Sequence, residues 1–105
     1  MANKALDYYS GLSRERAVSS LEMVRQIYGG MAVGDLLGTA AYYRRISSIA
    51  GILANILSDD GTSGLTLEKI TLRCGRSGIA LSTANLQPYL TEIQRQALKI
   101  IVSQK

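Results

Sequence analysis

The sequence predicts a mainly α-helical chain in which a short helix, a glycine-containing turn and a longer amphipathic helix make up the second half. Apolar side chains recur at helical spacing in several segments, and glycine-rich stretches separate these segments. The chain contains no Trp and no Phe, so aliphatic side chains must form most of its core. A length of 105 residues fits one domain, residues 1–105. A dimer interface would bury additional surface and so help to stabilise a domain of this size.

The residue types that are present exclude several kinds of chemistry. The chain has no histidine, and Cys74 is its only cysteine, which excludes imidazole catalysis, internal disulfides and the usual zinc sites. Met1–Ser13 lacks the apolar core and cleavage site of a signal peptide. The apolar run Ile46–Leu57 is too short for a bilayer, which takes about 20 residues to cross. We therefore expect a cytoplasmic protein with no metal or other cofactor and no membrane partner.

The net charge of +4 is confined to the second half of the chain. Residues 1–65 carry six basic and six acidic side chains, whereas residues 66–105 carry six basic side chains against Glu68 and Glu92 alone. Such an asymmetry is typical of a region that binds a polyanion. The alternative is an ordinary, mildly basic surface in water, and charge alone does not decide between the two interpretations.

The first half of the chain predicts a long helix. Residues 1–12 lack sustained periodicity and indicate a short first turn or a packed arm. Ser13 can cap the helix that follows, and Gly29–Gly30 is expected to end it. The apolar positions of its inner face are Ala17, Val18, Leu21, Val24, Ile27 and Tyr28. We expect this helix to be the dimerisation element of the N-terminal part, residues 1–39, because its Val18–Leu21–Val24 face would otherwise stay exposed.

A second long helix is expected over about Tyr43–Ser58, and it can be continuous with the segment Asp35–Ala41. Its apolar stripe consists of Ile46, Ile49, Ala50, Leu53, Ile56 and Leu57. The cluster Tyr42–Arg45 either contacts nucleic acid or, as is more common, packs its tyrosines inward and turns its arginines to water. A polar, glycine-rich loop then ends the helix. Its adjacent carboxylates, Asp59 and Asp60, suit a turn better than an acid–base pair.

From Leu65 onward the pattern predicts helix, turn and helix. Residues 65–72 alternate partly like a strand, but Thr66 can cap a helix over Leu67–Cys74, which we favour. Residues 75–81 form the turn, and Ser82 or Thr83 caps the long helix, with Pro88 about one turn inside it. The inward positions of this helix are Leu86, Leu90, Ile93 and Ala97. The β-branched run Ile100–Val102 predicts a short strand.

These pieces, in this order and spacing, resemble the winged helix-turn-helix domains of bacterial and archaeal transcription regulators. The resemblance covers residues 46–102 and implies a winged-helix-like part at residues 40–105. Its pieces are IAGILANILSDDG as first helix, LTLEKITLRCG as second helix, STANLQPYLTEIQRQAL as recognition helix and KIIV as first wing strand. The chain departs from the family at Ala97, where the recognition helix usually ends in glycine. We also expect the wing to be truncated, because too few residues follow for a second strand.

The resemblance implies a recognition helix that lies in the major groove of duplex DNA. The matching positions are Arg76, Ser82, Thr83, Asn85, Gln87, Thr91 and Arg95. The amides of Asn85 and Gln87 suit adenine edges, whereas hydroxyl and guanidinium groups suit phosphate oxygens. We therefore expect a non-enzymatic, sequence-specific DNA-binding regulator of transcription or replication that acts as a homodimer. The alternative is a helical protein-interaction module, such as a chaperone, anti-activator or adaptor, that binds a protein partner through the same fold.

Overall fold

The computed structural model describes residues 3–34 and 38–103, and among these residues it contains helices and turns without any strand. In chain order the elements are α1 (Lys4–Asp7), the 3₁₀ turn η1 (Tyr8–Gly11), α2 (Arg14–Gly34), α3 (Ala40–Asp60), the 3₁₀ turn η2 (Thr62–Gly64), α4 (Leu67–Arg76) and α5 (Thr83–Ser103). The mainly α-helical fold predicted from the sequence is therefore confirmed. Of the predicted segment Asp35–Ala41, residues 35–37 lie outside the described residues.

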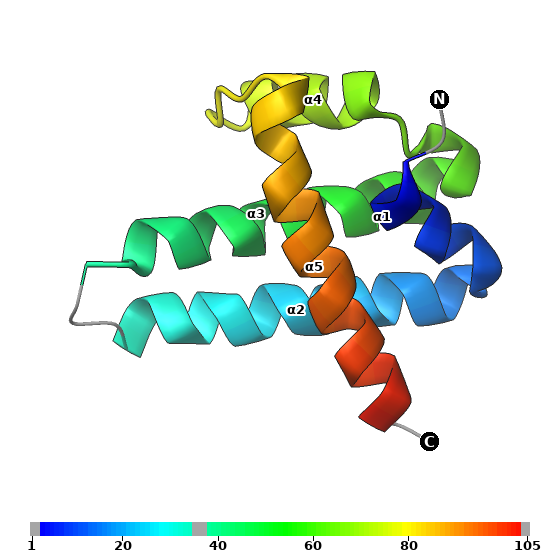
Figure 1. Ribbon diagram of the computed structural model, residues 1–105, viewed down its shortest axis with the longest axis horizontal. Helices are drawn as coiled ribbons and strands as arrows, with labels where there is room; N and C mark the ends of the chain where they lie inside the picture. Colours follow the sequence, from blue (N-terminus) through cyan, green and yellow to red (C-terminus); the bar gives the residue numbers. More distant parts are fainter. Residues whose placement is uncertain (1–2, 35–37, 104–105) are drawn as a thin grey trace.

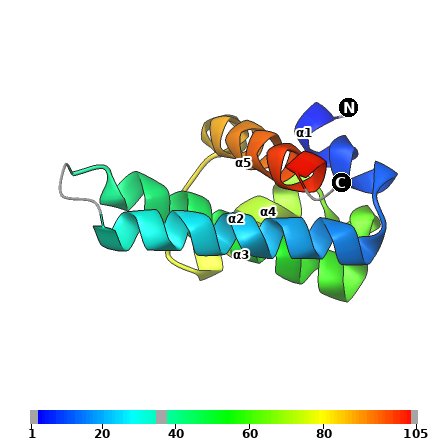
Figure 2. The same cartoon turned by 90° about the horizontal axis from the view of Figure 1, so that it is seen from below.

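Helices α2 and α3 lie side by side and antiparallel, and α5 crosses both of them (Figure 1). Figure 2 shows that α5 and α1 lie on the same face of the α2–α3 pair. The long helices bury a common core, to which α1 and α4 also contribute. Among its buried side chains are Leu6, Leu21, Leu53, Ile70 and Leu90. The N-terminal part is thus no separate layer, because α2 shares its core with the rest of the chain.

Helix α2 begins where the sequence predicts but ends later. The Ser13 hydroxyl caps it by accepting a hydrogen bond from the Arg16 N–H at 3.2 Å. The helix then continues through Gly29 and Gly30 to Gly34, and neither of the two earlier glycines has a positive φ. The prediction that they end the helix is wrong. The buried side chains of Tyr28 and Ala32 keep the packed face continuous on both sides of them, and this packing outweighs the weak helix preference of glycine.

The face of α2 that we expected to need a partner chain is covered within the molecule. Leu21 and Val24 are fully buried, and Val18 packs partly buried against the same core. The expectation that the Val18–Leu21–Val24 face would stay exposed is therefore wrong. The reason is that α3 and α5 both pack on α2, so a dimer formed through α2 would have to use other residues.

Helix α4 forms where the helical interpretation placed it, and the strand alternative for residues 65–72 is wrong. The Thr66 hydroxyl accepts a hydrogen bond from the Lys69 N–H at 3.2 Å and so caps the helix. Ile70 and Cys74 point into the core and are fully buried. After α4 the chain turns at Gly78, whose φ of 85° is a conformation that glycine adopts at little cost.

Helix α5 is continuous from Thr83 to Ser103, with Pro88 inside it. Ser82 precedes it and accepts a hydrogen bond from the Asn85 N–H at 3.2 Å, which confirms the predicted cap. The predicted inward positions Leu86, Leu90, Ile93 and Ala97 are buried. The prediction of a wing strand at Ile100–Val102 is wrong, because these residues form the last turns of α5. Ile100 and Ile101 extend its buried face, so packing overrides their β-branched preference.

Candidate nucleic-acid interface

The seven residues that the resemblance assigns to DNA binding do not gather in one cluster. Ser82, Thr83 and Asn85 lie exposed at the start of α5, and Arg76 lies exposed at the end of α4. Farther along α5, Gln87 and Thr91 lie beside the N-terminal segment, where they line a pocket with Asn3. Arg95 lies one turn beyond Thr91 and is engaged by Glu92. The start of α5 is therefore the part of the predicted site in which several exposed polar groups remain together.

Gln87 holds two elements of the chain together. Its Oε1 accepts a hydrogen bond of 2.6 Å from Nδ2 of Asn3, and its Nε2 donates to the Thr91 hydroxyl at 3.3 Å. The other end of the Asn3 amide caps α1 by accepting hydrogen bonds from the N–H groups of Ala5 and Leu6. Both ends of the Gln87 amide are thus occupied within the molecule, which gives this residue a structural role between α5 and α1.

Glu92 gathers hydrogen-bond donors from two helices. Its carboxylate is paired with Arg95 and accepts hydrogen bonds from Gln96 at 2.9 Å and from the Tyr28 hydroxyl at 3.1 Å. Burial acts to raise the pKa of Glu92, but these donors outweigh it, and the pKa lies below its ordinary value. Burial, with the Glu92 charge beside it, raises the pKa of Tyr28 to about 12. Much of the Arg95 charge is thus balanced within the chain.

Asn85 differs from Gln87 because its side-chain amide is exposed and makes no hydrogen bond with any described residue. It lies on the rim of a pocket of about 390 Å³ between α3 and α5. The residues that line this pocket are Tyr42, Arg45, Leu81, Asn85, Pro88 and Tyr89. The lining combines two phenol rings, two apolar side chains and one cation, and it contains no carboxylate.

The tyrosines of this pocket form part of a row of aromatic rings. The rings of Tyr42 and Tyr89 lie 5.8 Å apart, with an angle of 37° between their planes. Tyr43 continues the row toward the interior, at 5.8 Å from Tyr28. The guanidinium of Arg45 lies 5.9 Å from the centre of the Tyr89 ring and donates a hydrogen bond of 3.3 Å to its hydroxyl.

The packing interpretation of the cluster Tyr42–Arg45 describes most of what is observed, whereas contact of the cluster with nucleic acid stays a prediction. Tyr43 packs inward and both arginines are exposed, as the common packing arrangement requires. Tyr42, however, is 45% exposed and faces the pocket. Tyr42 and Arg45 were recognisable in the sequence as an aromatic–basic cluster. Nothing in the sequence pointed to Tyr89, because only the path of α5 across α3 brings it to this cluster.

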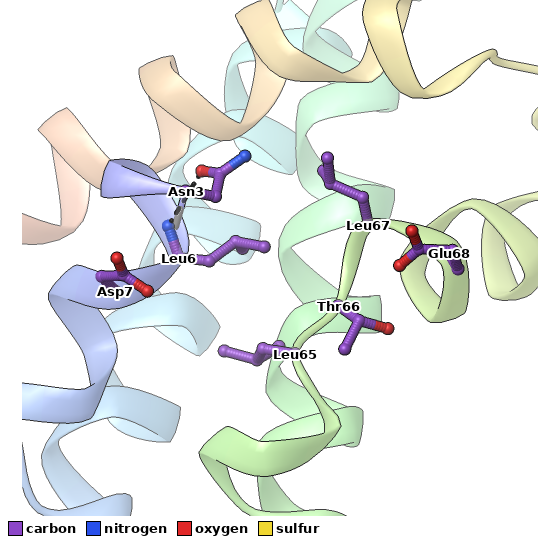
Figure 3. Close-up of a pocket in the computed structure, with 7 residues that line it drawn as sticks. All are labelled: Asn3, Leu6, Asp7, Leu65, Thr66, Leu67 and Glu68. Carbon is purple, nitrogen blue, oxygen red and sulfur yellow. Dashed lines mark hydrogen bonds between the residues drawn. The ribbon is translucent and has the colours of Figure 1, made fainter. Parts of the chain in front are cut away.

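A second pocket lies between α1 and the start of α4, with a volume of about 310 Å³ (Figure 3). Its two carboxylates, Asp7 and Glu68, lie on opposite sides of it and not against each other. Asp60 does not join them, since it pairs with Lys69, and this hydrogen bond lowers the pKa of its carboxyl. Over the described ranges, no group of three or more His, Cys, Asp or Glu side chains could hold a metal ion. The carboxylates of Asp7 and Glu68 therefore do not form a pair in this pocket.

No family model, curated protein or solved structure matches the chain. The resemblance to winged helix-turn-helix domains therefore rests on the sequence pattern of residues 46–102 alone. Within residues 3–34 and 38–103, no helix is both long enough and apolar enough to span a membrane.

Proposed function

We propose that the chain binds duplex DNA in a sequence-specific manner through the first turns of α5, as a homodimeric regulator of transcription or replication in the cytoplasm. The observation that carries this proposal is the exposure of Ser82, Thr83 and Asn85 together at the start of a long helix. The free amide of Asn85 offers a donor and an acceptor to an adenine edge. The hydroxyl groups and the N–H groups of the first turn suit phosphate oxygens.

In this proposal α4, the turn after it and α5 act as a helix-turn-helix. The outer ridge of α5 stands clear of the core and carries Ala84, Pro88, Thr91 and Arg95, all of which are exposed. Mostly small side chains on this ridge would let the helix approach base edges closely. Because the described residues form no wing, the contacts of one chain are few. A second copy on a half-site about one helical turn away would supply the remaining affinity.

The charges near the start of α5 favour an anionic partner. Arg45 and Arg76 are exposed, and neither forms an ion pair with any residue that the structure describes. The nearest acidic side chain on α5 is Glu92, which is paired with Arg95. Arg45 lines a pocket together with Asn85, and Arg76 ends α4 just before the turn that leads to α5, so both would suit phosphate oxygens near this turn.

The test is fluorescence anisotropy of a labelled, mixed-sequence duplex titrated with the chain at several salt concentrations. If Arg45 and Arg76 each neutralise a phosphate, the logarithm of the binding constant should fall with the logarithm of salt concentration with a slope of about −2 per chain. Arg45→Gln and Arg76→Gln should each reduce this slope by about one unit. An absence of binding at low salt would remove the proposal.

A second candidate function is a protein-interaction module, which a separate observation favours. A groove of about 300 Å³ runs between α2 and the C-terminal half of α5, and its lining includes Val24, Ile27 and Ile100. Ile27 at this groove remains 48% exposed. A partner held there by apolar contact would bind with little dependence on salt, so the same series of salt concentrations distinguishes the two functions.

A further inference from the structure

We propose that the pocket between α3 and α5 holds an unpaired nucleobase at the edge of the duplex that α5 binds. The inference rests on the proposed function and adds a second type of contact to it. Asn85 belongs both to the first turns of α5 and to the rim of this pocket. A base displaced from the end of a duplex, or from a locally opened one, would therefore reach the pocket without leaving the proposed interface.

The walls of the pocket suit a planar ring. Tyr42 has 45% of its surface exposed, so its ring is open to a stacking partner. The Tyr89 ring packs against Tyr42 at a ring separation of 5.8 Å, so a base would stack on the exposed part of Tyr42 and not between the two rings, and Pro88 and Leu81 complete an apolar lining. Every nucleobase has a face that stacks on such a ring, so this contact would tolerate different sequences while α5 reads the duplex.

The charge of the pocket favours a ring that is attached to an anionic backbone. Its single ionisable group of full charge is the guanidinium of Arg45, which is held over the Tyr89 ring by a hydrogen bond of 3.3 Å to the hydroxyl. No carboxylate lines the pocket, and the positive charge of Arg45 would repel a cationic ligand. Proteins that bind single-stranded nucleic acid place a cationic side chain near a phosphate and an aromatic ring against a base. An arginine beside an exposed tyrosine can make both contacts.

The experiment compares three labelled duplexes that share the same base pairs. One is blunt, one carries a short unpaired adenine extension, and one carries an abasic extension with the same number of phosphates. Fluorescence anisotropy should give an affinity for the adenine extension that is on the order of tenfold higher than for the abasic one, because only the adenine can stack. Tyr42→Leu should abolish this difference, and Tyr42→Phe should retain it. Val102→Ala, an exposed position on the last turn of α5, is the control.

Two outcomes would overturn the inference, and they are distinguishable. Equal affinities for the adenine and abasic extensions in the unaltered chain would exclude base stacking, while binding of the blunt duplex would still support the proposed function. Failure of all three duplexes to bind would remove both proposals together. Circular dichroism of Tyr42→Leu shows whether the helices are retained, and the comparison of extensions in the unaltered chain needs no variant.

Discussion

At the scale of single residues, the two amide side chains of α5 have opposite surroundings. Asn85 makes no side-chain hydrogen bond with the described residues, whereas Gln87 is bonded to Asn3 and Thr91. We therefore expect Asn85→Ala to weaken the binding of duplex DNA by about five- to 150-fold, the equivalent of one good base contact of about 1–3 kcal/mol. The stability of the Asn85→Ala chain to urea should be unchanged, because the substitution breaks no side-chain hydrogen bond within the chain.

The matched substitution Gln87→Ala should have the reverse effect. It removes the hydrogen bond between α5 and α1, and we expect the free energy of unfolding to fall by about 1 kcal/mol while DNA affinity stays the same. Urea denaturation and fluorescence anisotropy measure the two quantities. Equal losses of DNA affinity in both variants would contradict the assignment of different roles to these amides.

Glu92 should make the stability of the fold depend on pH in the acidic range. Its pKa is lower in the folded chain than in the unfolded chain, so its ionised form stabilises the fold above the ordinary value of 4.5. This contribution is lost as the pH falls through the lowered folded pKa. Glu92→Gln should therefore cost about 1 kcal/mol at neutral pH and should reduce the loss of stability that follows as the pH falls below the ordinary pKa of 4.5.

Urea denaturation at a series of pH values measures this effect. Glu15→Gln, at an exposed position in the first turn of α2, is the control for the removal of one negative charge. If Glu92→Gln lost as much stability on acidification as the unaltered chain, this result would refute a stabilising role for the ionised Glu92 carboxylate.

At the scale of elements, two glycines with contrasting surroundings should respond in opposite ways to a methyl group. Gly30 lies inside α2, and a Cβ placed there would meet nothing within 4 Å. A Cβ on Gly64 would lie 2.6 Å from Cβ of Asp60 and 3.1 Å from Cγ2 of Ile56. Gly30→Ala should raise the free energy of unfolding by about 1 kcal/mol, and Gly64→Ala should lower it by about 1–3 kcal/mol.

Thermal or urea denaturation of the two variants checks this prediction. The result for Gly30 also tests the length of α2, since alanine at a position that ended the helix would destabilise the chain. A loss of stability in Gly30→Ala would therefore contradict the continuous helix.

The same elements show how far local pattern determines structure. Ser13, Thr66 and Ser82 each cap the helix that the sequence assigned to them, because a cap depends on residues within one turn. The predictions for Gly30 and for the run Ile100–Val102 are wrong because the conformation of these residues depends on distant partners. The buried faces of α2 and α5 continue through these positions, and tertiary packing outweighs a local preference of at most about 1 kcal/mol.

At the scale of the whole molecule, the candidate site depends on how the helices cross. The start of α5 was predictable as a polar, capped helix end. The cluster Tyr42–Arg45 was also recognisable, but its contact with Tyr89 was not, because residues in the first turns of α3 meet Tyr89 only when α5 lies across the α2–α3 pair. In this chain without Trp or Phe, the way the helices cross brings Tyr42 and Tyr89 together. The spacing of the tyrosines along the sequence does not predict this arrangement.

The proposed homodimer is also a property of the whole molecule. The inner face of α2 is occupied, but Ile27 and Met31, one turn apart, are 48% and 41% exposed. Gly30 and Gly34 lie on the same stretch of α2, and a Cβ at either would meet nothing within 4 Å. The face of α2 that carries Ile27 and Met31 is therefore open to the same helix of a second copy, related by a two-fold axis.

We expect sedimentation velocity to show a dimer at micromolar concentration, and Ile27→Glu to shift it to a monomer because a charge would be buried in the interface. Val33→Glu places the same charge at another exposed position of α2, 89% exposed, and should leave the dimer intact. The monomeric Ile27→Glu chain should also bind duplex DNA more weakly, because each chain then engages one half-site alone. A strict monomer at high concentration would refute the homodimer, and equal effects of the two substitutions would refute this face of α2 as its interface.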